Sequence, residues 1–293
     1  MRIGIAGSSG LLGTATARHL VSQGHEIVRL VRHLPGAGER RIDLARRTVS
    51  GPGLTDLDAV INFAGAGIAD APWTEERKRI MRASRLATTE AIIGALHEAP
   101  SCRVLLNGSA VGYYGDQGDT VLDERSPRGE GYLANVCVQW ERAADMAPED
   151  VRVVKLRTGH VLTPKGGILG KQRLLFQLGL GGPIGDGKQY VSWIGVEDYT
   201  RAIEFLLTHG VRGPVNMTAP NPVTNARFAK AFGVALGRPA KIPVPLKAAS
   251  MVFKPEMVQD AMLGSQRALP TVLQNYEFRF KHADIDDAMD AVN

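Results

Sequence analysis

The first half of the chain alternates short apolar runs with stretches in which apolar residues recur every three or four positions. Residues 2–6 form an apolar run that predicts a β-strand, and the pattern over residues 11–23 predicts an amphipathic helix. Gly24 follows as a C-cap, and residues 25–31 predict a second strand. The first strand and the first helix are therefore joined by a short turn that contains three glycines.

The same alternation continues towards the middle of the chain. Apolar runs at residues 57–63, 103–107 and 151–156 predict further buried strands, and small residues follow the first of these at 64–67. Helical spacing covers residues 74–97 and returns at 140–145. Helices that separate short apolar strands are typical of an α/β fold, so we predict a doubly wound parallel sheet of the Rossmann type.

The pattern changes at residues 165–187, which are rich in glycine and lack the alternation. We therefore predict a dinucleotide-binding domain over residues 1–164 and a smaller α/β substrate region over residues 165–293, with residues of about 190–220 returning to the first domain. The glycines and proline of residues 179–187 favour turns. We expect a lip over the substrate here, with Lys188, Gln189 and Tyr190 directed at the ligand; a plain interdomain linker is the alternative.

Composition excludes several classes of protein. No apolar run approaches the roughly 20 residues that span a bilayer, and the start has no features of a signal peptide. Two cysteines make no disulfide framework and favour a reducing cytoplasm. The net charge is +5, but the Lys and Arg residues are scattered, so we expect a surface that attracts anionic ligands and no nucleic-acid partner. We single out no metal-ligating cluster.

The turn GSSGLLG at residues 7–13 carries the first candidate chemistry. It joins a strand to a helix, where backbone N–H groups and the helix dipole favour a phosphate. Gly7 permits the tight turn, Gly10 allows the backbone to approach a pyrophosphate, and Gly13 allows close packing of helix on strand. We predict that this turn binds a dinucleotide, against the alternative of an ordinary glycine-rich turn.

The end of the second predicted strand indicates which dinucleotide is bound. An acidic residue there would bind the ribose 2′-hydroxyl of NAD, whereas an arginine suits the 2′-phosphate of NADP. The residues are Val31, Arg32 and His33, with no acid among them. We therefore predict NADP(H) as the cofactor, with Arg32 on the 2′-phosphate and His33 or Arg29 as helpers.

Several further motifs, spread over nearly the whole chain, are similar to those of one known family. They are VINFAGAGI at 60–68, SRLATTE at 84–90, GSAVGYYGDQGD at 108–119, WERAA at 140–144, RTGHVL at 157–162, the stretch 178–203 and the stretch 216–233. With GSSGLLG, the chain resembles an atypical branch of the extended short-chain dehydrogenases/reductases, the epimerase/dehydratase-like "epimerase family protein" group. The resemblance implies a Rossmann domain that binds NADP(H) at the carboxyl ends of the strands and a smaller substrate domain.

The resemblance also implies individual cofactor contacts. Residues 62–65 match the segment that passes the adenine ribose and diphosphate, and Thr158–His160 follow the strand whose end lies near the nicotinamide. Arg85 matches a position near the cofactor, with a solvated helix face as the alternative, and Asp198 is either an interdomain residue or a helix N-cap. The expected cofactor-binding residues are Gly7, Ser9, Gly10, Leu11, Leu12, Gly13, Val31, Arg32, His33, Asn62, Phe63, Ala64, Gly65, Arg85, Gly108, Ser109 and His160.

The catalytic residues are where the chain departs from this superfamily. Most members use a serine and a Tyr-x-x-x-Lys pair, in which the lysine lowers the pKa of the tyrosine so that it relays a proton. Aligned on Glu141, the lysine position is Cys137 and the tyrosine position is Leu133; the serine position is Ala110. Tyr132 lies one residue too early, which on a helix rotates the side chain by about 100°.

Three residues remain as candidates for acid–base work: Ser109, Tyr113 and Tyr114. Ser109 and Tyr113 rank ahead of Tyr114, although a hydroxyl bonded to the backbone or a tyrosine used for packing are the alternatives. Cys137 is a conceivable nucleophile, but a buried thiol that acts as a small hydrophobe is the favoured reading.

Two classes of function stay open. The first is an NADP-dependent oxidoreductase or epimerase in which another residue or a water replaces the missing tyrosine. The second is a non-catalytic NADP-binding redox sensor or assembly partner. Leu133 and Cys137 would make one wall of the site beside the nicotinamide apolar. We therefore expect a small-molecule substrate of low polarity and slow turnover of sugar nucleotides. The sequence leaves the oligomeric state open, a homodimer included.

Overall fold

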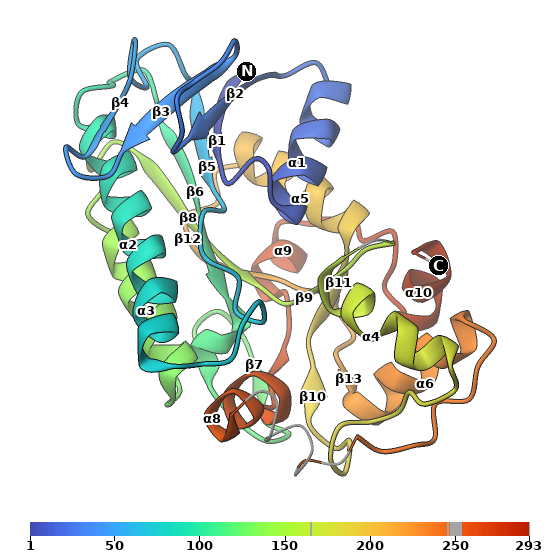
Figure 1. Ribbon diagram of the computed structural model, residues 1–293. Helices are drawn as coiled ribbons and strands as arrows, with labels where there is room; N and C mark the ends of the chain where they lie inside the picture. The colour runs from blue at the N-terminus through green and yellow to red at the C-terminus, as the bar shows by residue number, and fades with distance from the viewer. Residues whose placement is uncertain (165, 245, 247–253, 293) are drawn as a thin grey trace.

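The computed structural model describes residues 1–164, 166–244, 246 and 254–292. One large β-sheet forms the centre of the molecule. Its eight strands lie in the order β12-β8-β6-β5-β1-β2-β3-β4, and all neighbours run parallel except β3 and β4 (Figure 1). The strands are β1 (Arg2–Ala6), β2 (Glu26–Val31), β3 (Glu39–Asp43), β4 (Thr48–Val49), β5 (Ala59–Asn62), β6 (Val104–Ala110), β8 (Arg152–Thr158) and β12 (Gly213–Met217).

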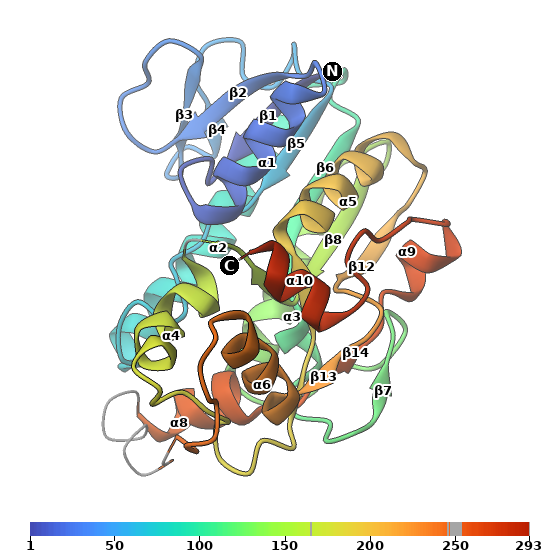
Figure 2. The same ribbon diagram turned by 90° about the vertical axis from the view of Figure 1, so that its right-hand side faces the viewer.

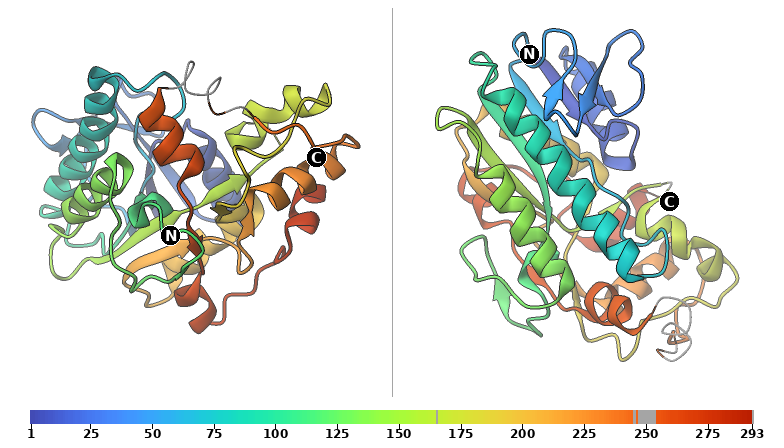
Figure 3. Two further views of the ribbon diagram at one scale, coloured as in Figure 1. Left: turned by 90° about the horizontal axis from the view of Figure 1, so that it is seen from below. Right: turned by 60° about the vertical axis from the view of Figure 1, so that its left-hand side comes forward.

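Helices cover both faces of this sheet. On one face lie α1 (Leu11–Ser22) and α5 (Val196–Thr208), which pack together over Ile3 and Ile5 (Figure 2). On the other face α2 (Glu75–Leu96) and α3 (Tyr132–Ala144) lie side by side (Figure 3). Since both faces are covered, the central strands are buried along their length, as parallel sheets require. The predicted doubly wound α/β fold is confirmed.

Two elements differ from the sequence-based expectation. The hairpin β3–β4 was not predicted, because its two strands are short and polar at alternate positions. Helix α3 begins at Tyr132 rather than at residue 140. Its first turn receives its cap from a distant residue, as described below, so no capping signal precedes it in the sequence.

The second region lies below the sheet in Figure 1 and has its own apolar cluster around Trp193, Phe228 and Phe232. It contains helix α4 (Gly167–Gln177) inside the glycine-rich stretch, where no helix was predicted, because its apolar residues are interrupted by glycines. Its other elements are β9 (His160–Leu162), β10 (Tyr190–Val191), β11 (Trp193–Gly195), β13 (Val223–Thr224), α6 (Asn225–Ala235), α8 (Pro255–Met257), the π-helical turn η2 (Val258–Leu263) and α10 (Ile285–Ala291). The remaining elements are the 3₁₀ turn η1 (Val111–Tyr114), β7 (Val121–Leu122), β14 (Arg267–Ala268) and α9 (Thr271–Asn275).

The chain crosses between the two regions more than once. Residues 196–217 supply α5 and β12 to the large sheet and its cover. Asp198, fully buried in the first turn of α5, accepts hydrogen bonds from the backbone N–H groups of Lys281 and His282 at 2.9 Å. It therefore fastens the C-terminal segment to α5, while Gly195 occupies the N-cap position. We propose that residues 1–164, together with residues of about 190–220, form the dinucleotide-binding domain, and that the rest of residues 165–293 forms the substrate region.

No helix among the described residues is long and apolar enough to cross a membrane.

Candidate functional site

The turn between β1 and α1 requires glycine at two positions. Gly7 has φ +76°, and a Cβ there would lie 2.9 Å from the carbonyl carbon of Phe63. A Cβ at Gly13 would overlap the carbonyl oxygen of Gly7 and lie 2.7 Å from Cα of Ser8. Gly7 and Gly13 thus have the steric roles that the sequence predicted for them.

The first backbone N–H groups of α1 have no acceptor within the helix, as at the start of any α-helix. Gly10 stands at the N-cap position and has no side chain to cap the helix. Ser9, Gly10 and Leu11 are exposed and Leu12 is half-buried. The first N–H groups of α1 therefore face outward at the positive end of the helix dipole, where an anion is stabilised.

The end of β2 carries Arg32 and His33, both exposed, after the half-buried Val31. The loop that follows folds back, so that Nε2 of His33 lies 3.2 Å from Oε2 of Glu39. The backbone N–H of Gly36 also donates to this carboxylate, and it holds the pKa of Glu39 below its usual range. Sequence reasoning missed Glu39 because β3 brings it beside β2 from a later part of the chain.

The segment after β5 is held by a buried asparagine. Nδ2 of Asn62 donates to Thr89 Oγ1 at 3.0 Å and to Asn107 Oδ1 at 2.8 Å, while its Oδ1 accepts the N–H of Ala64 at 3.1 Å. This arrangement places the backbone of Phe63 and Ala64 against Gly7. Two of the predicted cofactor segments therefore meet at the carboxyl edge of the sheet, where doubly wound folds bind ligands.

Arg85 on α2 reaches the same edge. Its side chain is 9% exposed, which rules out the alternative of a solvated helix face. Nη1 donates to the carbonyl oxygens of Met81 and Ala66 at 2.9 Å and 3.1 Å. Burial lowers the pKa of Arg85, because the charged form loses water.

The three candidate acid–base residues lie around one buried ion pair. Arg157 on β8 donates from Nε and Nη2 to the two carboxylate oxygens of Glu141 on α3, at 2.8 Å and 2.9 Å. Ser109 donates to the same carboxylate at 2.7 Å. Burial opposes the charge on Arg157, but Glu141 outweighs it and the pKa of Arg157 rises.

The two tyrosines contact Arg157 in different ways. Tyr114 is fully buried; its hydroxyl donates to Asn216 Oδ1 at 2.7 Å and accepts from Arg157 Nη1 at 3.0 Å. Burial raises the pKa of Tyr114 to about 12. Tyr113 is half-buried, and the guanidinium carbon of Arg157 lies 3.5 Å from the centre of its ring. Sequence reasoning missed Arg157, because its partners Glu141 and Tyr114 come from α3 and η1, which are distant from it in the sequence.

The positions of the missing tyrosine and lysine are apolar. Leu133 packs in the apolar cluster formed by Trp73, Met81 and Met257, with Ala66, Ile68, Tyr132, Ala261 and Met262 around them. Cys137 is buried, and burial raises the pKa of its thiol to about 11, which leaves it protonated near neutral pH. The hydroxyl of Tyr132 donates to the carbonyl oxygen of Lys78 at 2.5 Å.

Gly108 and His160 are two further predicted cofactor positions. A Cβ at Gly108 would lie 2.6 Å from the ring of Trp140, so α3 packs directly on the backbone of β6. His160 begins β9 beside β11, and burial lowers its pKa, so its imidazole is neutral near pH 7. The side chain of Thr158 lies 3.3 Å from the hydroxyl of Tyr199.

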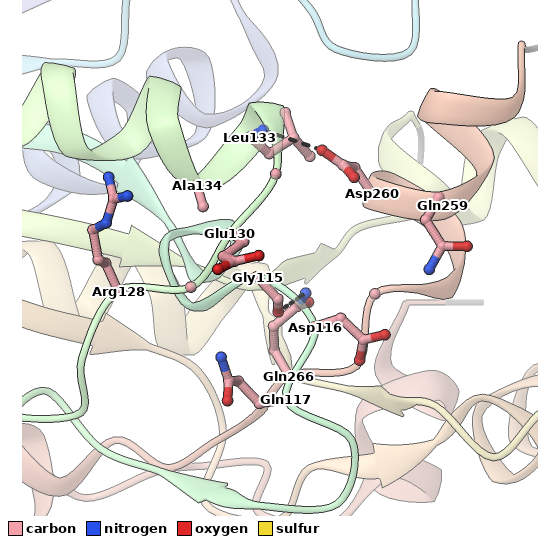
Figure 4. A pocket seen from close by; sticks show the side chains of 14 residues that line it. Gly115, Asp116, Gln117, Arg128, Glu130, Leu133, Ala134, Gln259, Asp260 and Gln266 are labelled. Atoms are coloured by element: carbon pink, nitrogen blue, oxygen red, sulfur yellow. Dashed lines mark hydrogen bonds between the residues drawn. The ribbon is translucent and has the colours of Figure 1, made fainter.

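A cavity of about 570 Å³ adjoins Leu133, between the loop after η1, the start of α3 and the residues around η2 (Figure 4). Asp260 of η2 lies at its wall and accepts the N–H groups of Tyr132 and Leu133 at 2.8 Å and 3.4 Å. A residue more than a hundred positions away thus caps α3. The polar lining includes Asp116, Gln117, Arg128, Glu130, Gln259 and Gln266.

The stretch 179–187 contains turns, and Gly181 and Gly182 within it are buried. Gln189 donates to the carbonyl oxygens of Ile184 and Met262 at 3.1 Å and 3.2 Å, so it holds this stretch against η2. Lys188 is exposed and Tyr190 belongs to β10. The predicted lip over a ligand stays a prediction.

Known proteins resemble this chain over most of its length. The family model described as NAD dependent epimerase/dehydratase family matches residues 3–218, and one described as a domain of unknown function (DUF1731) matches residues 244–292. Epimerase family protein Mb2239 of Mycobacterium bovis is 42% identical over 98% of this chain and 96% of its own. Human epimerase family protein SDR39U1 is 36% identical over 96% of each chain.

Two solved structures share the whole fold. The crystal structure of human epimerase family protein SDR39U1 (isoform 2) with NADPH has a TM-score of 0.93 at 32% identity, over 100% of this chain and 99% of that one. A nucleoside-diphosphate sugar epimerase from Corynebacterium glutamicum has a TM-score of 0.81 at 32% identity, over 99% of this chain and 57% of that one. The predicted resemblance to an atypical extended short-chain dehydrogenase/reductase group is confirmed.

Proposed function

The chain belongs to the NAD dependent epimerase/dehydratase family, and from that premise we propose that it is an NADP(H)-dependent oxidoreductase or epimerase-like enzyme. The observation that carries the proposal is the glycine turn before α1, whose close contacts admit no side chain at Gly7 or Gly13. The NADPH present in the crystal structure of the human relative supports the choice of cofactor.

The residues around the turn fit a dinucleotide. The uncapped first turn of α1 suits its diphosphate, and Arg32 suits a 2′-phosphate beyond β2. Residues 62–65, Arg85, Gly108 and His160 are the other residues that we propose to contact the dinucleotide. When bound, the nicotinamide would supply or accept the hydride.

Tyr113 is our proposed proton donor. Ser109 and Tyr114 both use their hydroxyl hydrogens within the buried network of Glu141, Arg157 and Asn216. Tyr113 is half-buried and lies on the face of the Arg157 guanidinium, which stabilises negative charge nearby. Ser109 and Tyr114 would then position Arg157 and, through it, Tyr113.

The cavity beside Leu133 is the proposed substrate site. Leu133 offers an apolar contact, as the sequence suggests for a substrate of low polarity, but the remaining wall is rich in carboxylate and amide groups. A ligand that places an apolar surface on Leu133 and hydroxyl or amine donors on the opposite wall fits both features. A bulky anionic sugar nucleotide fits poorly, because Asp116, Glu130 and Asp260 would repel it.

One observation favours the second function class, a non-catalytic NADP-binding protein. Position 137 carries a buried, protonated thiol in place of a lysine, so α3 supplies no cation for proton transfer. A redox sensor or assembly partner would need the cofactor site without this chemistry.

Titration with NADPH and NADH, followed by single-turnover assays with a panel of carbonyl compounds, tests the proposal. We expect tighter binding of NADPH and oxidation of bound NADPH by at least one carbonyl. Binding without any oxidation would favour the non-catalytic class, and failure to bind either cofactor would overturn both.

A further inference from the structure

The proposed substrate cavity carries an excess of negative charge, although the chain as a whole has a net charge of +5. The described residues that line it include three carboxylates and one guanidinium, those of Asp116, Glu130, Asp260 and Arg128. Nη1 of Arg128 donates to Asn135 Oδ1 at 3.2 Å, and no described residue forms an ion pair with any of the three carboxylates. The cavity therefore favours a cationic ligand over an anionic one.

A buried amide oxygen in the same wall indicates independently that a ligand binds here. Gln266 lines the cavity, and its side chain is 8% exposed. Its Nε2 donates to the carbonyl oxygen of Gly115 at 2.8 Å, whereas no described residue donates to its Oε1. Buried carbonyl oxygens in proteins normally accept a hydrogen bond, so the donor to this oxygen comes from a molecule that occupies the cavity.

Three acceptor side chains meet around Gly115. Oδ1 of Asp116 accepts the N–H of Ser265 at 3.2 Å, which holds this carboxylate beside Gln266. A Cβ at Gly115 would lie 2.9 Å from the backbone nitrogen of Glu130, so Glu130 starts from the same place. Figure 4 shows the three side chains around the middle of the cavity. Their oxygens match a protonated primary amine, which has three N–H donors and no acceptor.

The π-helical turn η2 forms another side of the cavity and contributes Gln259 and Asp260. π-helices are rare and occur frequently at functional sites. Oδ2 of Asp260 accepts the N–H of Tyr132 at 2.8 Å, and a Cβ at Gly131 would lie 2.9 Å from this oxygen. The carboxylate is thereby fixed beside Leu133, and the negative charge extends to the apolar end of the cavity.

We propose that the substrate carries a protonated primary amino group that donates to Asp116, Glu130 and Oε1 of Gln266, and an apolar segment that packs on Leu133. This inference rests on the proposed function and names the substrate class of the same cavity. The apolar contact at Leu133 favours an organic cation over a metal ion. The ammonium group serves recognition alone and takes no part in hydride transfer.

The test compares three probes of one size that differ in charge: cyclohexylamine, cyclohexanol and cyclohexanecarboxylate. Calorimetry with the full chain near neutral pH measures their affinities. We expect cyclohexylamine to bind about tenfold or more tightly than cyclohexanol, as one charge-assisted hydrogen bond implies. Cyclohexanecarboxylate should bind most weakly. The advantage of the amine should shrink as the salt concentration increases, because salt screens the carboxylates.

Variants of the cavity wall locate the binding. Glu130→Gln combined with Asp116→Asn should reduce the affinity for cyclohexylamine to that for cyclohexanol and should leave cyclohexanol binding unchanged. Both side chains are exposed, so the exchange removes charge without disturbing a buried position. Asp119→Asn removes an exposed charge from the same loop, outside the lining of the cavity. This control should bind all three probes as the unchanged protein does.

Equal affinity of the unchanged protein for the amine and the alcohol would overturn the inference, and so would binding of no probe at all. An advantage of the amine that survives in the double variant would also overturn it, because the cation would then bind elsewhere. NADPH titration of the same sample keeps the two claims apart, since loss of the amine effect with intact NADPH binding leaves the proposed function standing. Should the double variant fail to fold, Glu130→Gln alone decides in the same way.

Discussion

The turn between β1 and α1 and the wall formed by β6, α3 and β8 lie at the same edge of one sheet, but different kinds of contact build them. The turn consists of backbone: its close contacts are made by Gly7, Gly13 and the main chain of Phe63. The wall consists of side chains from distant segments, centred on the pair of Arg157 and Glu141. The spacing of the glycines therefore indicates the first region in the sequence, whereas no local pattern indicates the second.

This difference suggests how tolerant each region is to exchange of its residues. A turn whose close contacts are made by main-chain atoms leaves no room for other side chains, so its residues can rarely be exchanged. A side-chain network can be rearranged, provided that each buried group keeps a partner. In this chain the buried Glu141 accepts hydrogen bonds from Arg157 and Ser109.

The largest effect is expected at the turn. Gly13→Ala would place a Cβ onto the carbonyl oxygen of Gly7, so α1 could not pack on β1 and NADPH binding should become undetectable by calorimetry. Gly210→Ala is the matched control, since nothing lies within 4 Å of its added Cβ. Retained NADPH binding in Gly13→Ala would refute the steric account of the turn.

The next largest effect is a loss of stability when the buried cation of the wall is removed. Arg157→Met leaves Glu141 buried without its ion-pair partner and should lower the free energy of unfolding by about 3–5 kcal/mol in urea denaturation. Adding Glu141→Gln should recover part of the loss, because the unpaired charge is then gone. If the double variant is no more stable than the single one, the pair is not the centre of the network.

The preference between NADPH and NADH tests the role of Arg32 at the end of β2. Arg32→Asp should weaken NADPH binding by about ten- to a hundredfold, the range for one charge-assisted hydrogen bond, and should make NADH the preferred cofactor. Arg18→Asp, an equal change of charge on the exposed face of α1, is the control. Equal affinity of the unchanged protein for NADPH and NADH would contradict this assignment.

Turnover distinguishes the residues of the wall. Ser109→Ala combined with Tyr113→Phe should abolish whatever hydride transfer is found, since the proposed donor and a group that orients Arg157 are both lost. Cys137→Ala should leave the rate within about twofold, because a thiol with a pKa of about 11 is protonated at the assay pH. Loss of activity in the cysteine variant with unchanged NADPH binding would point to different chemistry.

The smallest expected effect is on the rate at which iodoacetamide modifies Cys137. At pH 8 about one Cys137 thiol in a thousand is ionised, so iodoacetamide should modify it slowly in the folded protein and rapidly after denaturation. Because the pKa is raised, the rate in the folded protein should climb as the pH increases towards 11. Rapid labelling of native Cys137 at pH 8 would mean that α3 opens readily.

The sequence by itself indicated the parallel sheet, the course of β1, α1 and β2, and the glycine turn, because each of these follows from local periodicity or from the spacing of the glycines. It also indicated that the Tyr-x-x-x-Lys pair is missing, since that spacing lies within one helix. Only the tertiary structure decided that α3 begins at Tyr132, because its cap is Asp260. Tertiary structure likewise brought Glu39 to His33 and buried Arg85 at the edge of the sheet. These features depend on residues that approach one another only after the sheet and its helices have packed, and no local pattern encodes such an approach.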